Sequence, residues 1–143
     1  MSTPTGGPDP IRLQKILFVS SDELRHLSLR RILRRDPRTD VVLSALTIAE
    51  ARAVLSAEAP VTVLIVDEDL GPRAVADLLG DIGAGSGAAV ADLIVLLTGG
   101  GPMPRAVVPG DRVVDVRLRQ PFRPDHVDVL IARLAARREA RDR

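Results

Sequence analysis

The sequence predicts an α/β protein in which helices cover both faces of a doubly wound, five-stranded parallel sheet. Five short apolar runs alternate along the chain with segments of helical periodicity, and this order is typical of βαβ units. The runs are rich in Val, Ile and Leu without polar alternation, as expected of strands buried on both faces. The length of 143 residues fits one domain.

The first strand is expected at 15–19 and the first helix at 23–35, where Asp36 and Pro37 end the helical pattern. Apolar side chains recur in this helix at spacings of three and four residues, which indicates one face turned toward the core. The positions expected to face the core are Leu24, Leu27, Ile32 and Leu33.

The second βα unit is expected to begin with a strand at 41–45. Thr47 and Glu50 have the capping-box spacing, which predicts a helix that continues to about Ala57. The β-branched run 61–66 predicts the third strand.

The third and fourth units are expected to contain a helix over 73–79 and a strand over 93–97 that ends at Thr98. The segment 99–110 is rich in Gly and Pro, so we expect its helix to be short or absent.

The fifth strand is expected within 113–119, and Pro124 favours the start of a last helix. The positions of this helix expected to face the core are Val127, Leu130, Ile131 and Leu134.

The composition excludes several classes of site. The chain has no cysteine, which excludes disulfides, thiolate metal sites and a cysteine nucleophile, and it has only two histidines. The formal net charge is +1 and aromatic residues are 1%, so nothing points to nucleic acid or to an anionic membrane as a partner. No apolar run is long enough to span a bilayer, and residues 1–10 lack the pattern of a signal peptide. We therefore expect a cytoplasmic protein.

Polar residues gather where the predicted strands end. In open parallel sheets, functional groups lie at the carboxyl ends of the strands. A carboxylate directly after an apolar strand, as at Asp67, is poor core material and points to a site. The candidate site residues are Ser20, Ser21, Asp22, Asp67, Asp69, Thr98, Gln120 and Pro121.

On these residues the chain resembles the receiver domains of two-component response regulators, over about residues 13–137. The resemblance implies a flavodoxin-like sheet of strand order 2-1-3-4-5 and a receiver domain over 11–138, between a disordered tail at 1–10 and a C-terminal tail at 139–143. It places Asp67 at the phosphoacceptor position and Thr98 at the switch hydroxyl. The Gln120-Pro121-Phe122 segment corresponds to the Lys-Pro-Phe motif, whose proline is cis in the family.

The chain departs from the receiver pattern at its charged accessory positions. The acidic pair that holds Mg²⁺ is replaced by Ser20 and Ser21, and the lysine is replaced by Gln120. The aromatic switch position on the fifth strand corresponds to Arg117, a charge that is costly to bury. Because Mg²⁺ prefers carboxylate ligands, we expect weak Mg²⁺ binding and no other cofactor. The resemblance assigns to Asp69 a backbone carbonyl ligand, and leaves the direction of Asp22 open.

Several of these residues also have ordinary structural interpretations. Ser20 has the capping-box spacing with Glu23, an interpretation that we favour over a role in the site, and Asp22 is the alternative helix cap. Thr98 is as well explained by the end of a strand as by a switch. His26 and His126 are expected at the surface.

The favoured functional hypothesis is a stand-alone, atypical receiver domain in two-component signalling, which is not an enzyme and acts through protein binding. Its expected partner is a histidine kinase or another signalling protein, with a homodimer possible, through the first helix or through the fifth strand and last helix. One alternative is an active receiver that takes phosphate on Asp67 in a phosphorelay. Another is a flavodoxin-like module that binds a small ligand, against which the scarcity of aromatic residues counts.

Overall fold

A computed structural model describes residues 11–83, 90–99 and 114–141. Five strands form one parallel sheet in the order β2-β1-β3-β4-β5, which confirms the predicted topology. The order reverses next to β1, so β1 and β3 lie side by side at the centre. The strands are β1 (Leu13–Val19), β2 (Thr39–Ala45), β3 (Val61–Asp67), β4 (Ala91–Thr98) and β5 (Val116–Arg119).

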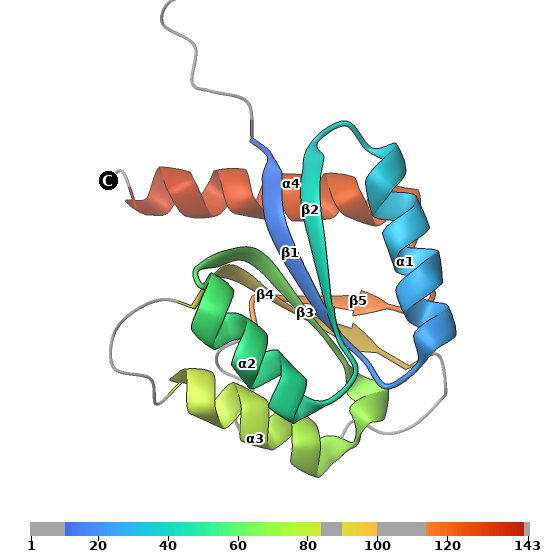
Figure 1. The fold of residues 1–143 in the computed structure, drawn as a ribbon. Coiled ribbons are helices and arrows are strands. Elements are labelled where there is room, and N and C mark those ends of the chain that lie inside the picture. The colour runs from blue at the N-terminus through green and yellow to red at the C-terminus, as the bar shows by residue number, and fades with distance from the viewer. Residues whose placement is uncertain (1–10, 84–89, 100–113, 142–143) are drawn as a thin grey trace, which may run out of the picture.

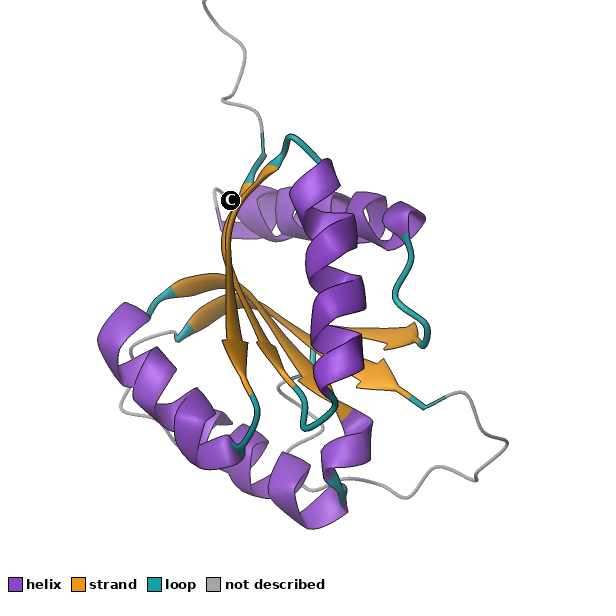
Figure 2. Cartoon of the chain, turned by 45° about the vertical axis from the view of Figure 1, so that its right-hand side comes forward, coloured by secondary structure: helices purple, strands orange, loops and turns teal. Residues whose placement is uncertain are grey.

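Helices cover both faces of the sheet (Figures 1 and 2). Helices α1 and α4 lie on one face, and α2 and α3 on the other, as right-handed crossovers require. A short 3-10 turn, η1, links β3 to α3. The helical elements are α1 (Glu23–Arg35), α2 (Ile48–Glu58), η1 (Glu68–Leu70), α3 (Pro72–Gly83) and α4 (Pro124–Arg141).

The sheet separates two hydrophobic cores. Alternate side chains of each strand point to opposite faces, so Phe18 and Ile65 enter the core beneath α1 and α4, whereas Leu17 and Leu64 enter the core beneath α2 and α3. In β3 every residue is buried. This double burial explains why the sequence of β3 is a nearly continuous apolar run.

The structure corrects the predicted core face of α1. Leu24 and Leu27 were expected inside, but their exposed fractions are 75% and 60%. The buried face is instead made by His26, Leu29 and Leu33. The expectation of a surface position for His26 is therefore wrong: the ring packs on Phe18 with centroids 4.7 Å apart.

Helix α2 begins at the Thr–Glu pair that the sequence predicts. Thr47 is the N-cap and its hydroxyl accepts a hydrogen bond from the Glu50 N–H. The Glu50 carboxylate in turn accepts one from the Leu46 N–H, one residue before the cap. These contacts confirm that a Thr–Glu pair starts this helix.

Several element boundaries differ from the expected ones by a few residues. Strands β1, β2 and β4 begin two residues earlier than the apolar pattern indicates, and α3 extends from Pro72 to Gly83. Helix α4 runs through Arg141, so it continues into the expected C-terminal tail at 139–143. The expected disordered tail at 1–10 and nearly all of the glycine-rich segment expected to replace a helix, 100–110, lie outside the described residues.

No helix in the described ranges combines the length and the apolar character needed to cross a membrane.

Candidate functional site

Four polar side chains meet at the carboxyl ends of β1, β3 and β5. Ser20 follows β1, Asp67 is the last residue of β3, and Gln120 follows β5. Arg25, from the first turns of α1, reaches over the same edge of the sheet. The edge predicted from the sequence therefore does hold a polar cluster, and Asp67 is at its centre.

The Asp67 side chain is only 1% exposed, and its carboxylate accepts four hydrogen bonds. Oδ2 accepts from the Ser20 hydroxyl at 2.6 Å and from Arg25 Nη1 at 2.8 Å. Oδ1 accepts from the Asp69 backbone N–H and from Gln120 Nε2, both at 2.9 Å. An ionised carboxylate has about four lone-pair sites. All of them are therefore occupied by donors from the chain itself.

Arg25 brings a permanent positive charge to this cluster. Its Nη1 atom contacts Asp67 Oδ2 and also Asp69 Oδ2, which lies 2.5 Å away. Its Nε atom lies 3.5 Å from Asp22 Oδ2. The hydrogen bond to Asp67 raises the pKa of Arg25 above its ordinary value. The guanidinium thus links three carboxylates, and because it belongs to the chain, this cation cannot leave the site as a bound metal ion can.

Local structure explains why Arg25 reaches the site. Asp22 is the N-cap of α1, and its carboxylate accepts hydrogen bonds from the Leu24 and Arg25 N–H groups. This cap fixes the first turn of the helix. The same turn places Arg25 three residues after Asp22, on the face that overlooks Asp67.

Ser20 belongs to the site and does not cap α1. Its side chain is fully buried, its hydroxyl donates to Asp67, and the same oxygen accepts the Asp22 N–H at 3.1 Å. The capping-box interpretation of Ser20 is therefore wrong, and the alternative cap, Asp22, is confirmed. The Ser20 carbonyl lies 2.7 Å from His26 Nε2. Because a carbonyl only accepts, that ring nitrogen carries the proton.

Gln120 contacts Asp67 through its amide nitrogen, as noted above, and its backbone N–H donates to the Thr98 carbonyl at 2.9 Å. The peptide bond between Gln120 and Pro121 is cis, which confirms the expectation drawn from the family. Gln120 thus supplies a neutral donor to the carboxylate, where the receiver pattern has a charged lysine.

The side chains of the remaining candidate residues lie around this cluster, and none of them is hydrogen-bonded to the Asp67 carboxylate. The Thr98 hydroxyl donates to the Leu118 carbonyl at 3.3 Å, so it bonds to the neighbouring strand. Ser21 is exposed, and so is Arg117 on β5. Asp69 offers its carboxylate to Arg25, in addition to its backbone N–H that reaches Asp67.

The residues present do not fit a resident Mg²⁺ ion. The ion requires oxygen ligands with free lone pairs, usually including one or two carboxylates. Here both Asp67 oxygens are fully hydrogen-bonded, and the Arg25 guanidinium lies between Asp67 and Asp69. A second cation close to this guanidinium would be repelled. Within the described ranges no three side chains of the metal-binding types form a group that could hold a metal.

A cavity of about 310 Å³ opens beside the site. Its wall is mainly apolar, and Arg25 and Gln120 contribute polar groups. This volume is at the lower end of the range for ligand pockets, roughly 300–1,000 Å³. The cavity has room for a small molecule or for a partner's side chain. Its lining residues are Phe18, Arg25, Ser28, Leu29, Leu97, Gln120, Pro121 and Phe122.

Arg25 is the site residue that the sequence analysis missed. It lies 42 residues before Asp67 in the chain, within the first turns of α1. One signal was available, since an Asp at the start of a helix and an Arg three residues later lie on neighbouring positions of one face.

Comparisons with known proteins support the fold. No family model matches the sequence, and no curated protein matches it. Among solved structures, a receiver domain protein (CheY-like) from Methanospirillum hungatei JF-1 is similar at a TM-score of 0.71 and 15% identity, over 90% of this chain and 99% of that one. A response regulator receiver domain protein from Clostridium thermocellum is similar at 0.66 and 18% identity, over 90% and 98%.

A third similar structure is described as the P1 domain of CheA3 in complex with CheY6 from R. sphaeroides. Its TM-score is 0.69 at 17% identity, over 87% of this chain and 98% of that one. The chain therefore has the fold of response regulator receiver domains, with the five strands of its parallel sheet in the order β2-β1-β3-β4-β5.

Proposed function

We propose that this chain is a receiver-type signalling module that works by binding another protein and in which Asp67 is not phosphorylated. The observation that carries the proposal is the Arg25–Asp67 ion pair within a carboxylate whose four acceptor sites are all occupied. The module has the receiver fold and an internal cation in place of a bound metal.

The chemistry of phosphoryl transfer explains why this arrangement favours an inactive acceptor. The acceptor carboxylate must use a free oxygen lone pair to attack phosphorus, and a cation must neutralise the charge on the transferred oxygens. Asp67 would have to give up the hydrogen bonds from Ser20 and Arg25 at Oδ2, or those from Asp69 and Gln120 at Oδ1. The lost bonds would raise the barrier, and no metal would lower it.

Protein binding is the activity that remains for such a module. The solved complex of a CheA3 P1 domain with CheY6 shows that one protein of this fold binds a signalling partner. We propose a partner of the same general kind, a histidine kinase domain or another signalling protein. The site then fixes the position of α1, because Asp22 and Arg25 attach its first turn to the sheet edge.

The proposal is tested by titrating the isotope-labelled protein with beryllofluoride and Mg²⁺ while the backbone amide resonances are recorded. Beryllofluoride mimics a phosphoryl group only if Asp67 and a metal both bind it. We expect no saturable shift at the amides of residues 67–70. Titration of Asp67→Asn under identical conditions should likewise produce no saturable shift at these amides. Saturable shifts that Asp67→Asn abolishes would overturn the proposal.

A further inference from the structure

One face of α1 carries a continuous strip of exposed side chains. Leu24, Leu27, Arg31 and Arg34 follow one another at spacings of three, four and three residues. These spacings match the contact positions of a helix that packs along another helix. We call these four residues, with the adjacent Arg35, the α1 strip.

The apolar end of the α1 strip is strongly exposed. Leu24 and Leu27 have exposed fractions of 75% and 60%, the highest of the large hydrophobic residues in the described ranges. Burying a leucine side chain that is otherwise exposed to water is favourable by about 1.5–3 kcal/mol. Two such leucines one turn apart therefore form a small apolar contact surface.

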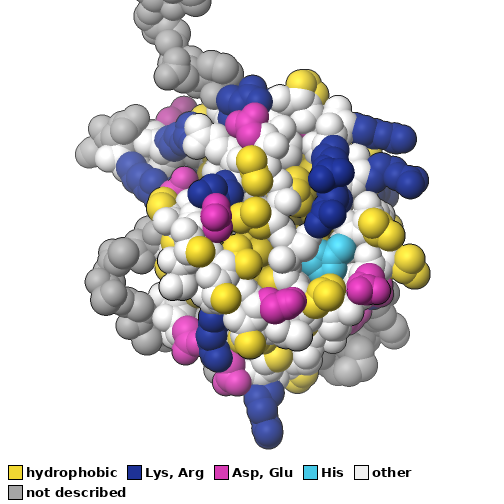
Figure 3. Space-filling view, viewed as in Figure 1, with side chains coloured by type: hydrophobic (Ala, Val, Ile, Leu, Met, Phe, Trp, Pro, Cys, Tyr) yellow, Lys and Arg dark blue, Asp and Glu magenta, His cyan; other side chains and the backbone are white. Residues whose placement is uncertain are grey.

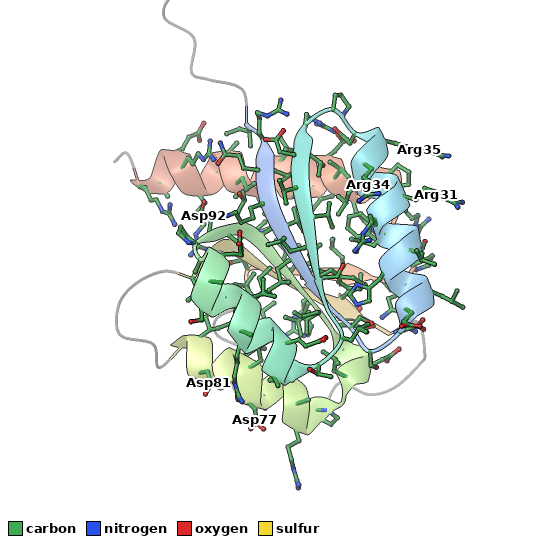
Figure 4. All side chains as sticks on the ribbon, viewed as in Figure 1. Arg31, Arg34, Arg35, Asp77, Asp81 and Asp92 are labelled. Carbon is green, nitrogen blue, oxygen red and sulfur yellow. The ribbon has the colours of Figure 1, made fainter. Side chains whose placement is uncertain are left out.

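The other end of the α1 strip is basic. Arg31, Arg34 and Arg35 lie along the C-terminal half of α1, and Arg31 and Arg35 extend away from the sheet (Figure 4). In the space-filling view, dark-blue side chains gather over this half of the helix and yellow ones lie over its N-terminal half (Figure 3). A shallow hollow of about 420 Å³ follows this surface, lined by Leu27, Arg30, Arg31, Arg34 and Arg35.

Six arginines in the described ranges pair their guanidinium groups with carboxylates, and the arginines of the α1 strip differ from those six. No ion pair to a described residue is seen for Arg31, Arg34 or Arg35, and Arg30 donates only to the Ser44 hydroxyl. The paired arginines are Arg12, Arg25, Arg38, Arg52, Arg137 and Arg141. The basic end of the α1 strip thus has its charge available for an outside partner.

We infer that the α1 strip binds an acidic amphipathic helix of a partner protein. This inference rests on the proposed function, since it names the kind of partner that the module binds. The partner helix would place apolar side chains against Leu24 and Leu27 and Asp or Glu side chains against Arg31 and Arg34. Arg and carboxylate groups form paired hydrogen bonds of defined geometry, so the basic end would select the partner and fix its register.

Charge complementarity favours this occupant over a second copy of the chain. Packing α1 on α1 of another copy would place several arginines near one another, with Glu23 as the main acid outside the site cluster. A nucleic acid would pair with the arginines but would leave both leucines exposed. A helix with an apolar end and an acidic end uses both halves of the α1 strip.

The surface is formed before the partner arrives. The Asp22 cap and the Arg25 ion pairs attach the first turn of α1 to the sheet edge. On the side of α1 that faces the core, Leu29 and Leu33 are buried. A preformed surface loses less conformational entropy on binding than one that must fold. The internal cation therefore holds the α1 strip in position.

Binding is tested with synthetic two-heptad helical peptides. Leu fills the contact positions of one heptad and Glu those of the other, and both sequence orders are used because parallel and antiparallel packing reverse the order. The labelled protein is titrated at low and at physiological salt, and amide shifts are mapped. We expect shifts confined to residues 24–35 and weaker binding at higher salt. The control peptide, with Gln in place of Glu, should bind about tenfold more weakly.

Charge reversal on the protein provides the decisive variant. Arg31→Glu with Arg34→Glu should weaken binding of the Glu peptide by about tenfold or more, and a peptide with Lys in place of Glu should bind this variant instead. The matched control, Arg73→Glu with Arg133→Glu on α3 and α4, should bind as the parent chain does. Because all four side chains are exposed, circular dichroism should show an unchanged fold.

Several outcomes would overturn the inference. They are equal binding of the Glu and Gln peptides, no effect of charge reversal, peptide shifts outside α1, and association of the chain with itself through α1. Tighter binding to anionic phospholipid vesicles or to duplex DNA than to the peptide would also overturn it. A phosphoryl group on Asp67 would refute the proposed function without changing these peptide results, so the two failures can be distinguished.

Discussion

The Nη1 atom of Arg25 lies 2.8 Å from Oδ2 of Asp67, a carboxylate that is 1% exposed and 42 residues further along the chain. This contact joins the first turns of α1 to the end of β3, and it places a fixed positive charge beside a buried negative one. A buried carboxylate without a charged or hydrogen-bonding partner is strongly unfavourable. The ion pair therefore serves the stability of the fold and the chemistry of the site together.

Replacing Arg25 by Ala should destabilise the protein by about 2 kcal/mol. The change removes one of the hydrogen-bond donors to the buried Asp67 carboxylate, together with the positive charge that compensates it. Chemical unfolding in urea gives the free energy of unfolding for comparison with the parent chain. Arg31→Ala is the control on the same helix. Since Arg31 is exposed, that change should alter stability by less than about 0.5 kcal/mol. Equal effects of the two variants would show that the ion pair contributes nothing.

His126 should give the protein a pH dependence near neutrality. Its Nδ1 accepts a hydrogen bond from the Arg123 N–H at 3.0 Å, which requires the neutral ring, and burial lowers the pKa of His126 below its ordinary value of 6.5. A depressed folded-state pKa contributes stability that is present above the unfolded-state value and is lost as the pH falls through the folded-state value. The free energy of unfolding should therefore decrease on acidification from about pH 7.5 to about pH 5.5.

His126→Gln separates this titration from the helix cap. Glutamine at the third position of a helix can accept the same N–H and does not titrate. The variant should keep most of the stability at alkaline pH and should lose less on acidification than the parent chain. An unchanged pH profile in His126→Gln would assign the effect to other groups.

Restoring phosphoryl transfer should require removal of the internal cation as well as return of the missing charges. Ser20→Asp, Ser21→Asp and Gln120→Lys supply two carboxylates and one ammonium group, but Arg25 still engages Asp67 in that variant. We expect intact-mass analysis to show phosphorylation by acetyl phosphate only when Arg25→Ala is added. The further change Asp67→Asn should abolish the gain.

The outcome of this series depends on a folded protein, which circular dichroism checks. A triple variant that is phosphorylated with Arg25 in place would show that the guanidinium does not block the site.

The sequence carries most of the fold because strand burial and helix spacing repeat in every βα unit. The apolar run at 61–66 predicted a central strand, and β3 is indeed buried on both faces. The error in α1 has a physical cause: Leu24 and Leu27 share a helical face with apolar spacing, but His26 replaces an apolar residue on the face that is actually buried. A periodicity argument assigns the leucines to the core, since it cannot recognise that one buried position is occupied by a histidine bonded to the Ser20 carbonyl.

The candidate site was predictable where it depends on strand ends and unpredictable where it depends on side-chain reach. The location of Asp67 and Gln120 follows from the parallel sheet, because strand ends meet at one edge. The contacts of Arg25 depend on how a long side chain folds back over that edge. The Ser20 hydroxyl was assigned to the helix cap because short-range spacing favoured it, whereas the buried Asp67 carboxylate is the partner that it contacts.

We propose that Asp67 lies at an acceptor position yet does not accept a phosphoryl group. The most direct measurement is the intact mass of the parent chain after incubation with acetyl phosphate and Mg²⁺, beside Asp67→Asn treated in the same way. We expect an unchanged mass for both proteins, because Arg25, Ser20, Gln120 and the Asp69 N–H occupy the carboxylate of the parent chain. A mass increase of one phosphoryl group in the parent chain that is missing from Asp67→Asn would contradict it.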